Sequence, residues 1–208
     1  MRKLFLITFL SILFTAGLAF AKSDKNIMPV LKFAGTKYTL MYSAESKETG
    51  GYINEYYKAH QTYTSWTELI GVHHYPTAFY PLEHAQEFAE YLNESGVPAS
   101  LETDEKNNEA MMYFVVVDRH KLPIIVEFNI FKYVKSPVCG TVGLQYARRY
   151  RLNSPLEIDK AKKEILKIGL KYIKRLDKLK VPEVINLNID NGKYSLKEGC
   201  NNEVENLN

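Results

Sequence analysis

Residues 111–151 read MMYFVVVDRHKLPIIVEFNIFKYVKSPVCGTVGLQYARRYR, and this stretch decides the fold. Met111 to Asp118 is nearly continuous apolar sequence, which predicts a central strand covered on both faces. Ile124 to Tyr133 and Thr141 to Arg151 alternate in character with the period of two that is typical of strands. Because only short turns separate the three segments, they are expected to pair antiparallel.

Two amphipathic helices are predicted in the sequence, one before these strands and one after them. The first is Pro81 to Ser95, in which apolar residues recur every three or four positions and Gly96 follows as a stop signal. The second begins at the capping box Ser154-Pro155-Leu156-Glu157 and keeps the same spacing to Leu179. Its outward face is basic, which is typical either of a solvated helix or of a contact surface.

Strand signals precede the first helix at Lys37 to Ala44, Tyr52 to Tyr57 and Trp66 to Tyr75. A small hairpin on Asn191-Gly192 is predicted in the tail. The element order is βββαβββα plus this C-terminal hairpin. We therefore predict an α+β fold, with an antiparallel sheet of about five to six strands and two main helices packed on one face.

The first 21 residues have the three parts of a secretory signal peptide: basic Arg2 and Lys3, the apolar run 4–20, and small residues that end at Ala21. The alternative is an uncleaved membrane anchor. Cleavage would leave a single domain at residues 22–180 and a polar extension at residues 181–208. The expected location is the periplasm or the medium, as for a bacterial exported protein, without stable membrane insertion.

The chain after cleavage is close to neutral. Losing Arg2 and Lys3 leaves 25 basic against 24 acidic side chains. This balance provides no concentrated basic face for nucleic acid, so nucleic acid is not an expected partner. The expected partners are a protein or a small molecule in the cell envelope or the medium.

Cys139 and Cys200 are the two cysteines of the chain. In an oxidising compartment an isolated pair is most simply one disulfide, here one that ties the tail to a turn of the sheet. Closing this loop would contribute about 3–4 kcal/mol in the chain-entropy model. The alternative makes Cys139 a nucleophile assisted by His120 and Asp118.

Other candidate chemistry is sparse. His73 and His74 are neighbours on a strand and should point to opposite faces, so they cannot both bind one metal ion. Glu55 and Glu127 could form a carboxylate pair for glycoside cleavage. For Glu127 we prefer a cross-strand ion pair with one of two neighbouring arginines, Arg148 or Arg149. No catalytic residue, metal ion or cofactor is assigned.

The chain is rich in aromatic residues, with 15 Tyr, 10 Phe and one Trp, and many lie between residues 50 and 80. Aromatic residues gathered on an exposed surface often mark recognition, although such residues also build cores. We predict an exported, non-enzymatic binding module that uses this stretch. An exported hydrolase and a structural subunit of a cell-envelope assembly are the alternatives. The candidate binding residues are Tyr52, Tyr56, Tyr57, Trp66, His73, His74 and Tyr75.

Overall fold

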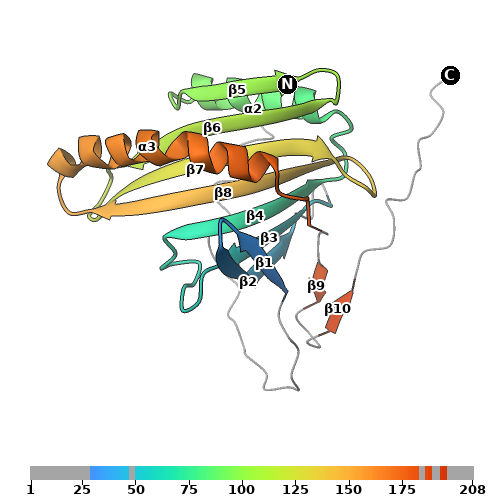
Figure 1. The fold of residues 1–208 in the computed structure, drawn as a ribbon, viewed down its shortest axis with the longest axis horizontal. Coiled ribbons are helices and arrows are strands. Elements are labelled where there is room, and N and C mark those ends of the chain that lie inside the picture. Colours follow the sequence, from blue (N-terminus) through green and yellow to red (C-terminus); the bar gives the residue numbers. More distant parts are fainter. Residues whose placement is uncertain (1–28, 47–49, 183–185, 189–192, 196–208) are drawn as a thin grey trace.

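The computed structural model describes residues 29–46, 50–182, 186–188 and 193–195. Its main element is an eight-stranded sheet in which all neighbouring strands are antiparallel, in the order β1-β2-β3-β4-β8-β7-β6-β5 (Figure 1). The strands are β1 (Val30–Phe33), β2 (Thr36–Glu45), β3 (Tyr52–Tyr57), β4 (Glu68–Tyr75), β5 (Ala99–Asp104), β6 (Glu109–Asp118), β7 (Ile124–Lys135) and β8 (Thr141–Leu152). The helices of this part are α2 (Pro81–Glu94) and α3 (Ile158–Asp177), and the single 3-10 turn η1 (Pro155–Glu157) leads into α3.

The prediction of five to six strands is wrong, because the sheet has eight. The two missed strands are its edges, β1 and β5. β1 has four residues and turns into β2 through Ala34 and Gly35, which both have positive φ. β5 reads ASLETD and is exposed at most positions, so its apolar alternation is limited to Ala99 and Leu101 and is too short to reveal a strand. Met111 to Asp118, predicted to be central, therefore lies one strand in from the edge.

The two helices lie on opposite faces of the sheet, and the prediction that both pack on one face is wrong. The buried stripe of α2 packs against β6 and β7 residues such as Met112 and Phe131. The buried stripe of α3 packs against the other side of β7, at Phe128 and Ile130. Figure 1 shows α3 in front of the sheet and α2 behind it. The physical reason is that β7 presents large apolar side chains on both faces, which both need cover.

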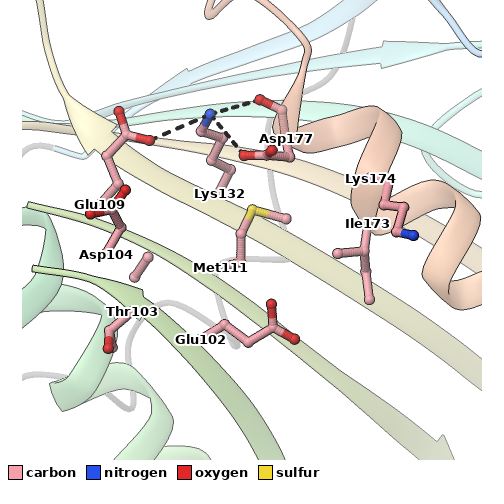
Figure 2. Close-up of a pocket in the computed structure, with 10 residues that line it drawn as sticks. Glu102, Thr103, Asp104, Glu109, Met111, Lys132, Ile173, Lys174 and Asp177 are labelled. Carbon is pink, nitrogen blue, oxygen red and sulfur yellow. Dashed lines mark hydrogen bonds and ion pairs between the residues drawn. The ribbon is translucent and has the colours of Figure 1, made fainter. Parts of the chain in front are cut away.

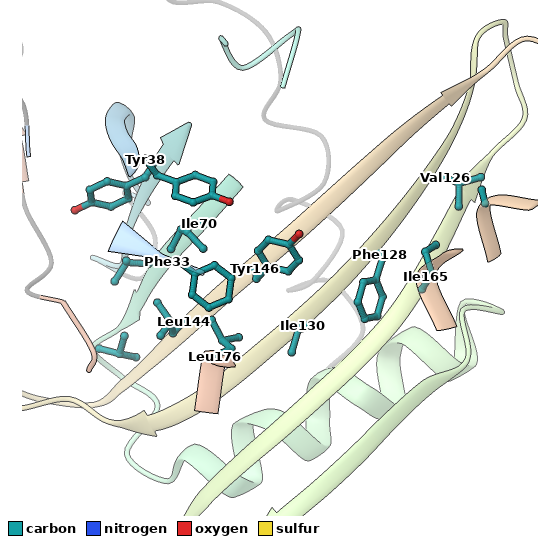
Figure 3. Packing of buried hydrophobic residues seen from close by; sticks show 14 of the residues in the cluster. Phe33, Tyr38, Ile70, Val126, Phe128, Ile130, Leu144, Tyr146, Ile165 and Leu176 are labelled. Atoms are coloured by element: carbon teal, nitrogen blue, oxygen red, sulfur yellow. The ribbon is translucent and has the colours of Figure 1, made fainter. Parts of the chain in front are cut away.

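The larger core lies on the α3 side of the sheet. Figure 3 shows how side chains from distant segments meet there, with Phe33 and Tyr38 near Tyr146 and with Phe128 near Ile165 of α3. The Tyr146 ring stacks on Tyr172 of α3, with the ring centroids 4.6 Å apart. Strands β1 to β4 and the helix therefore share one apolar interior.

The second helix begins near the predicted capping box. The Ser154 hydroxyl accepts a hydrogen bond from the Leu156 amide, and the Glu157 carboxylate accepts one from the Asn153 amide. The turn η1 precedes the α-helix proper, which starts at Ile158. The predicted tail hairpin is present as β9 (Asn186–Asn188) and β10 (Lys193–Ser195).

The predicted signal peptide and its cleavage site lie outside the described residues, so export stays a prediction. Within the described ranges, no helix combines the length and the apolar composition needed to cross a membrane.

Candidate functional site

Most of the aromatic residues predicted to form a binding surface are buried. Tyr52, Tyr56, Tyr57 and Trp66 are between 1% and 5% exposed. Tyr56 belongs to the α3-side core, and Tyr57 packs with Trp66 in a smaller cluster around Leu69. In the stretch 50–80 the strongly exposed aromatic residues are instead Tyr63, Phe79 and Tyr80. The aromatic content of this stretch therefore mainly serves packing.

His73, His74 and Tyr75 are partly exposed at the end of β4. The two histidines point to opposite faces, as strand alternation predicts. His73 Nε2 lies 2.8 Å from Gln145 Oε1 on the α2 side. His74 Nε2 lies 2.9 Å from the Cys139 carbonyl oxygen and 3.8 Å from the Cys139 sulfur.

The structure does not bring Cys139 and His120 together. His120 and Asp118 lie at the turn that precedes β7, and Cys139 lies at the turn that follows it. The twelve residues of β7 separate the two turns by roughly 40 Å. No free thiol occurs among the described residues. Cys200 lies outside them, so the predicted bridge stays a prediction.

A row of polar side chains crosses four strands on the face that α2 also occupies. We call it the polar row, and its first segment links β8 to β7. Arg149 donates from Nε and Nη2 to Glu127 Oε2, at 3.0 and 2.8 Å. Asn129 Nδ2 donates to Glu127 Oε1, and Gln145 Nε2 donates to Asn129 Oδ1 at 2.7 Å. The members of the polar row are Glu55, Tyr57, His73, Glu127, Asn129, Gln145 and Arg149.

The second segment of the polar row lies on β3, where the Tyr57 hydroxyl donates a hydrogen bond to Glu55. Strand register brings it beside the first segment, because Glu55 lies opposite Gly71 and Gly71 lies opposite Gln145. Glu55 is near enough to Glu127 and Arg149 for their charges to shift its pKa. The polar row therefore extends across β3, β4, β8 and β7.

Gly71 makes room for the centre of the polar row. A Cβ atom at this position would lie 2.6 Å from Gln145 Oε1 and 2.7 Å from His73 Nε2. Real Cβ atoms do not approach other heavy atoms so closely, so a larger residue would displace the bond between His73 and Gln145. Glycine is required here for space, since the position has no positive φ.

Burial shapes the electrostatics of the polar row. It raises the pKa of the Glu55 carboxyl and the nearby Glu127 adds to that rise, while the Tyr57 hydrogen bond and Arg149 oppose it. Burial raises the pKa of Tyr57, and the Glu55 carboxylate raises it further. Burial lowers the pKa of His73 to about 4, against the opposing hydrogen bond to Gln145. The row thus favours the neutral forms of Glu55, Tyr57 and His73.

Aromatic rings support the polar row at both ends. The guanidinium of Arg149 lies 3.7 Å from the centroid of the Trp66 ring, a cation–π contact that fixes the orientation of the arginine. At the other end, the His73 ring packs against the Phe131 ring, with the two ring centroids 5.5 Å apart. The Glu127 and Arg149 side chains are still 21% and 22% exposed, so solvent reaches the row.

The sequence interpretation of Glu127 is confirmed in its preferred form, since Glu127 pairs across the strands with Arg149. The roles of Asn129 and Gln145 were missed. A signal was available, because Glu127 and Asn129 share one face of β7 and Gln145 faces the same way on the adjoining strand. Polar residues that interrupt apolar faces on neighbouring strands indicate such a network.

Glu68 forms a second polar cluster on the α3 side. Its carboxylate accepts a hydrogen bond from Tyr38 at 2.9 Å and pairs with Lys58 at 2.7 Å and Arg148 at 3.4 Å. These partners fully engage Glu68 in holding β2, β4 and β8 together. Among the described residues, no group of three or more His, Cys, Asp or Glu side chains is placed to hold a metal ion.

A pocket of about 280 Å³ lies where the C-terminal end of α3 approaches β5 and β6 (Figure 2). Lys132 contacts its acidic neighbours there, at 3.5 Å from Glu109 and 3.2 Å from the Asp177 carboxylate. It also donates to the Asp177 carbonyl oxygen at 2.7 Å. Lysine is favourable at a helix C-terminus, so this contact anchors α3 to the sheet.

Comparison with known proteins adds one relationship. Residues 26–189 match the model of a protein family, a range that includes the whole eight-stranded sheet and both helices. No curated protein and no solved structure matches the chain.

Proposed function

We propose that this chain, which belongs to the family matched over residues 26–189, is an exported binding protein that holds a small polar ligand on the polar row. The observation that carries this proposal is the extent of the row, in which hydrogen bonds connect side chains of β4, β8 and β7 and strand register places Glu55 and Tyr57 of β3 beside them. Burying hydrogen-bonded polar groups adds little folding stability compared with burying well-packed apolar groups. A network of this size is therefore better explained by recognition than by stability.

The proposal keeps the stretch 50–80 as part of the binding surface but changes its chemistry. Glu55, Tyr57 and His73 belong to that stretch, and they join β7 and β8 residues in the row. The buried aromatic residues around them act as supports. Rigid supports of this kind hold polar groups in a geometry suited to a ligand, which reduces the entropy lost on binding.

The charges of the polar row indicate the class of ligand. Glu127 and Arg149 neutralise each other, and burial favours the neutral form of Glu55. The amide of Gln145 adds hydrogen-bonding capacity without charge. We expect an uncharged small molecule rich in hydroxyl or amide groups, because an ion would find no unpaired charge of opposite sign in the row.

A ligand screen by thermal shift tests this proposal. The protein of residues 22–208 would be heated with mono- and disaccharides and with amino acid amides, and stabilising compounds would be titrated calorimetrically. Gln145→Ala should weaken binding about tenfold or more, since it removes a hydrogen-bonding group from the centre of the row. Glu102→Gln, on the opposite face at β5, is the matched control and should bind normally. The proposal would be contradicted if no compound in the screen stabilised the protein, or if Gln145→Ala bound the ligand as tightly as the wild type.

A hydrolase that uses Glu55 and Glu127 is the second candidate. The observation that favours it is the raised pKa of Glu55, because a general acid must hold its proton near neutral pH. Glu127, paired with Arg149, would be the second carboxylate. Turnover of aryl glycosides that disappears in Glu55→Gln would select this candidate over simple binding.

A further inference from the structure

The outer face of α3 carries two exposed leucines among lysines. Leu166 is 78% exposed and Leu170 is 69% exposed, and the two lie one helical turn apart. The core-facing stripe of the helix is separate and complete, with Ile158, Ala161, Ile165 and Leu176 buried. The two exposed leucines therefore make no contribution to the core, and they stand out from the surface.

The positive charge of the protein is concentrated on this helix and the three residues that follow it. Residues 158–180 contain nine Lys or Arg against three acidic residues, a net charge of +6. The chain from residue 22 has a net charge of +1, so the remainder carries −5. Four exposed lysines lie along one side of the two leucines on the outer face of the helix, and none of them is in an ion pair within the described part of the chain. They are Lys163, Lys167, Lys171 and Lys174.

We propose that this face of α3 docks the protein on an anionic phospholipid surface. The leucines would enter the boundary between headgroups and acyl chains, while the lysine ammonium groups contact the phosphates. Lysine stems are long enough to let both happen together. The proposal is independent of the ligand on the polar row, which lies on the other face of the sheet.

The shape and charge of the surroundings favour a membrane over a second copy of the chain. α3 projects from the sheet in front of β7 and β8 (Figure 1), and a soft, flat surface can meet such a ridge without a matching groove. Packing α3 against α3 would bring two segments of +6 together, which like-charge repulsion disfavours. Acidic Glu102 and Asp104 on β5 would be repelled by phosphates, which limits the contact to the helix.

Vesicle sedimentation tests the proposal with the protein of residues 22–208. The vesicles would be phosphatidylcholine with roughly one-third phosphatidylglycerol, or phosphatidylcholine alone, because anionic lipid gives the surface the negative potential that attracts lysines. The protein should bind the anionic vesicles at low salt and should dissociate as the salt concentration rises. Leu166→Ser with Leu170→Ser should lower the partition coefficient at least about tenfold. Lys163→Gln, Lys167→Gln and Lys171→Gln together should lower it about a hundredfold.

Two matched controls isolate the helix face. Leu122→Ser changes an equally exposed leucine in the turn before β7. The combination Lys37→Gln, Lys106→Gln and Lys121→Gln removes the same charge from other exposed sites. Binding should stay within about twofold for the leucine control and should fall far less for the lysine control than for the helix variant. The proposal is overturned if anionic vesicles are not bound, if the helix variants bind like their controls, or if Leu166→Ser with Leu170→Ser converts a dimer to a monomer.

Discussion

Replacing Gly71 by alanine should destabilise the protein through the centre of the polar row. The new Cβ atom would lie 2.6 Å from Gln145 Oε1, 2.7 Å from His73 Nε2 and 3.2 Å from Gln145 Cβ. Overpacking of this kind costs about 1–3 kcal/mol, and losing the bond between His73 and Gln145 adds about 1 kcal/mol. The lower backbone entropy of the unfolded alanine variant offsets about 0.4–1 kcal/mol of this. We expect a net loss of about 2 kcal/mol in the free energy of unfolding.

Urea unfolding of Gly71→Ala, Gln145→Ala and the double variant measures this effect. Truncating Gln145 to alanine removes the closest of these contacts, the one with Oε1, and leaves those with Gln145 Cβ and His73 Nε2. The two substitutions should therefore be coupled by about 1 kcal/mol. Gly169→Ala in α3 is the matched control, since its Cβ atom would meet Phe128 at an ordinary 3.5 Å. This control should keep or raise stability, because alanine favours helix. Equal stability of Gly71→Ala and the wild type, or strictly additive effects, would refute the reasoning.

Three further predictions concern the pH response, the arginine of the polar row and the chain termini. Burial lowers the pKa of His73 and of His84 to about 4, below the unfolded value of about 6.5, so stability should fall as the pH drops from about 6.5 towards 4. His73→Gln with His84→Gln should flatten this part of the urea midpoint profile; an unchanged slope would be a contrary result. Arg149→Lys should lose about 1 kcal/mol of unfolding free energy in the same assay, because lysine cannot reproduce the forked bond to Glu127 or stack on Trp66, and Arg149→Ala should lose about 2 kcal/mol. Mass spectrometry of the protein from an exporting host should give a chain that begins at Lys22 with no titratable thiol under non-reducing denaturation; a retained Met1 would contradict export.

Local sequence patterns predicted most of the interior elements of the fold. Strong alternation identified β7 and β8, and the capping box at Ser154 identified the start of the second helix. The edge strand β5 was missed because only Ala99 and Leu101 pack on the core, which leaves too short an apolar pattern to identify a strand. The side of the sheet that each helix covers could not be predicted either. It depends on which face of β7 each connection reaches, and apolar side chains occupy both.

The candidate site was less predictable than the fold. The aromatic residues between 50 and 80 were interpreted as surface because aromatic side chains serve both recognition and packing. Only the tertiary structure separates Tyr57, which is buried, from Tyr63, which is exposed. The polar row depends on register between strands far apart in sequence, as where Gly71 lies opposite both Glu55 and Gln145. Residue types alone do not specify that register.

The pairing of β4 with β8 determines when the sheet can be completed. These two central strands join Tyr75 to Thr141 and Glu68 to Arg148, so every contact between them spans more than sixty residues. In the sheet, β8 is the strand that joins the group β1 to β4 to the group β5 to β7. During synthesis, the β8 edge of β4 therefore stays unpaired until β8 has left the ribosome. Pairing between strands so far apart in sequence slows folding. A chain that folds late stays unfolded for longer, and only an unfolded chain can pass through a narrow channel.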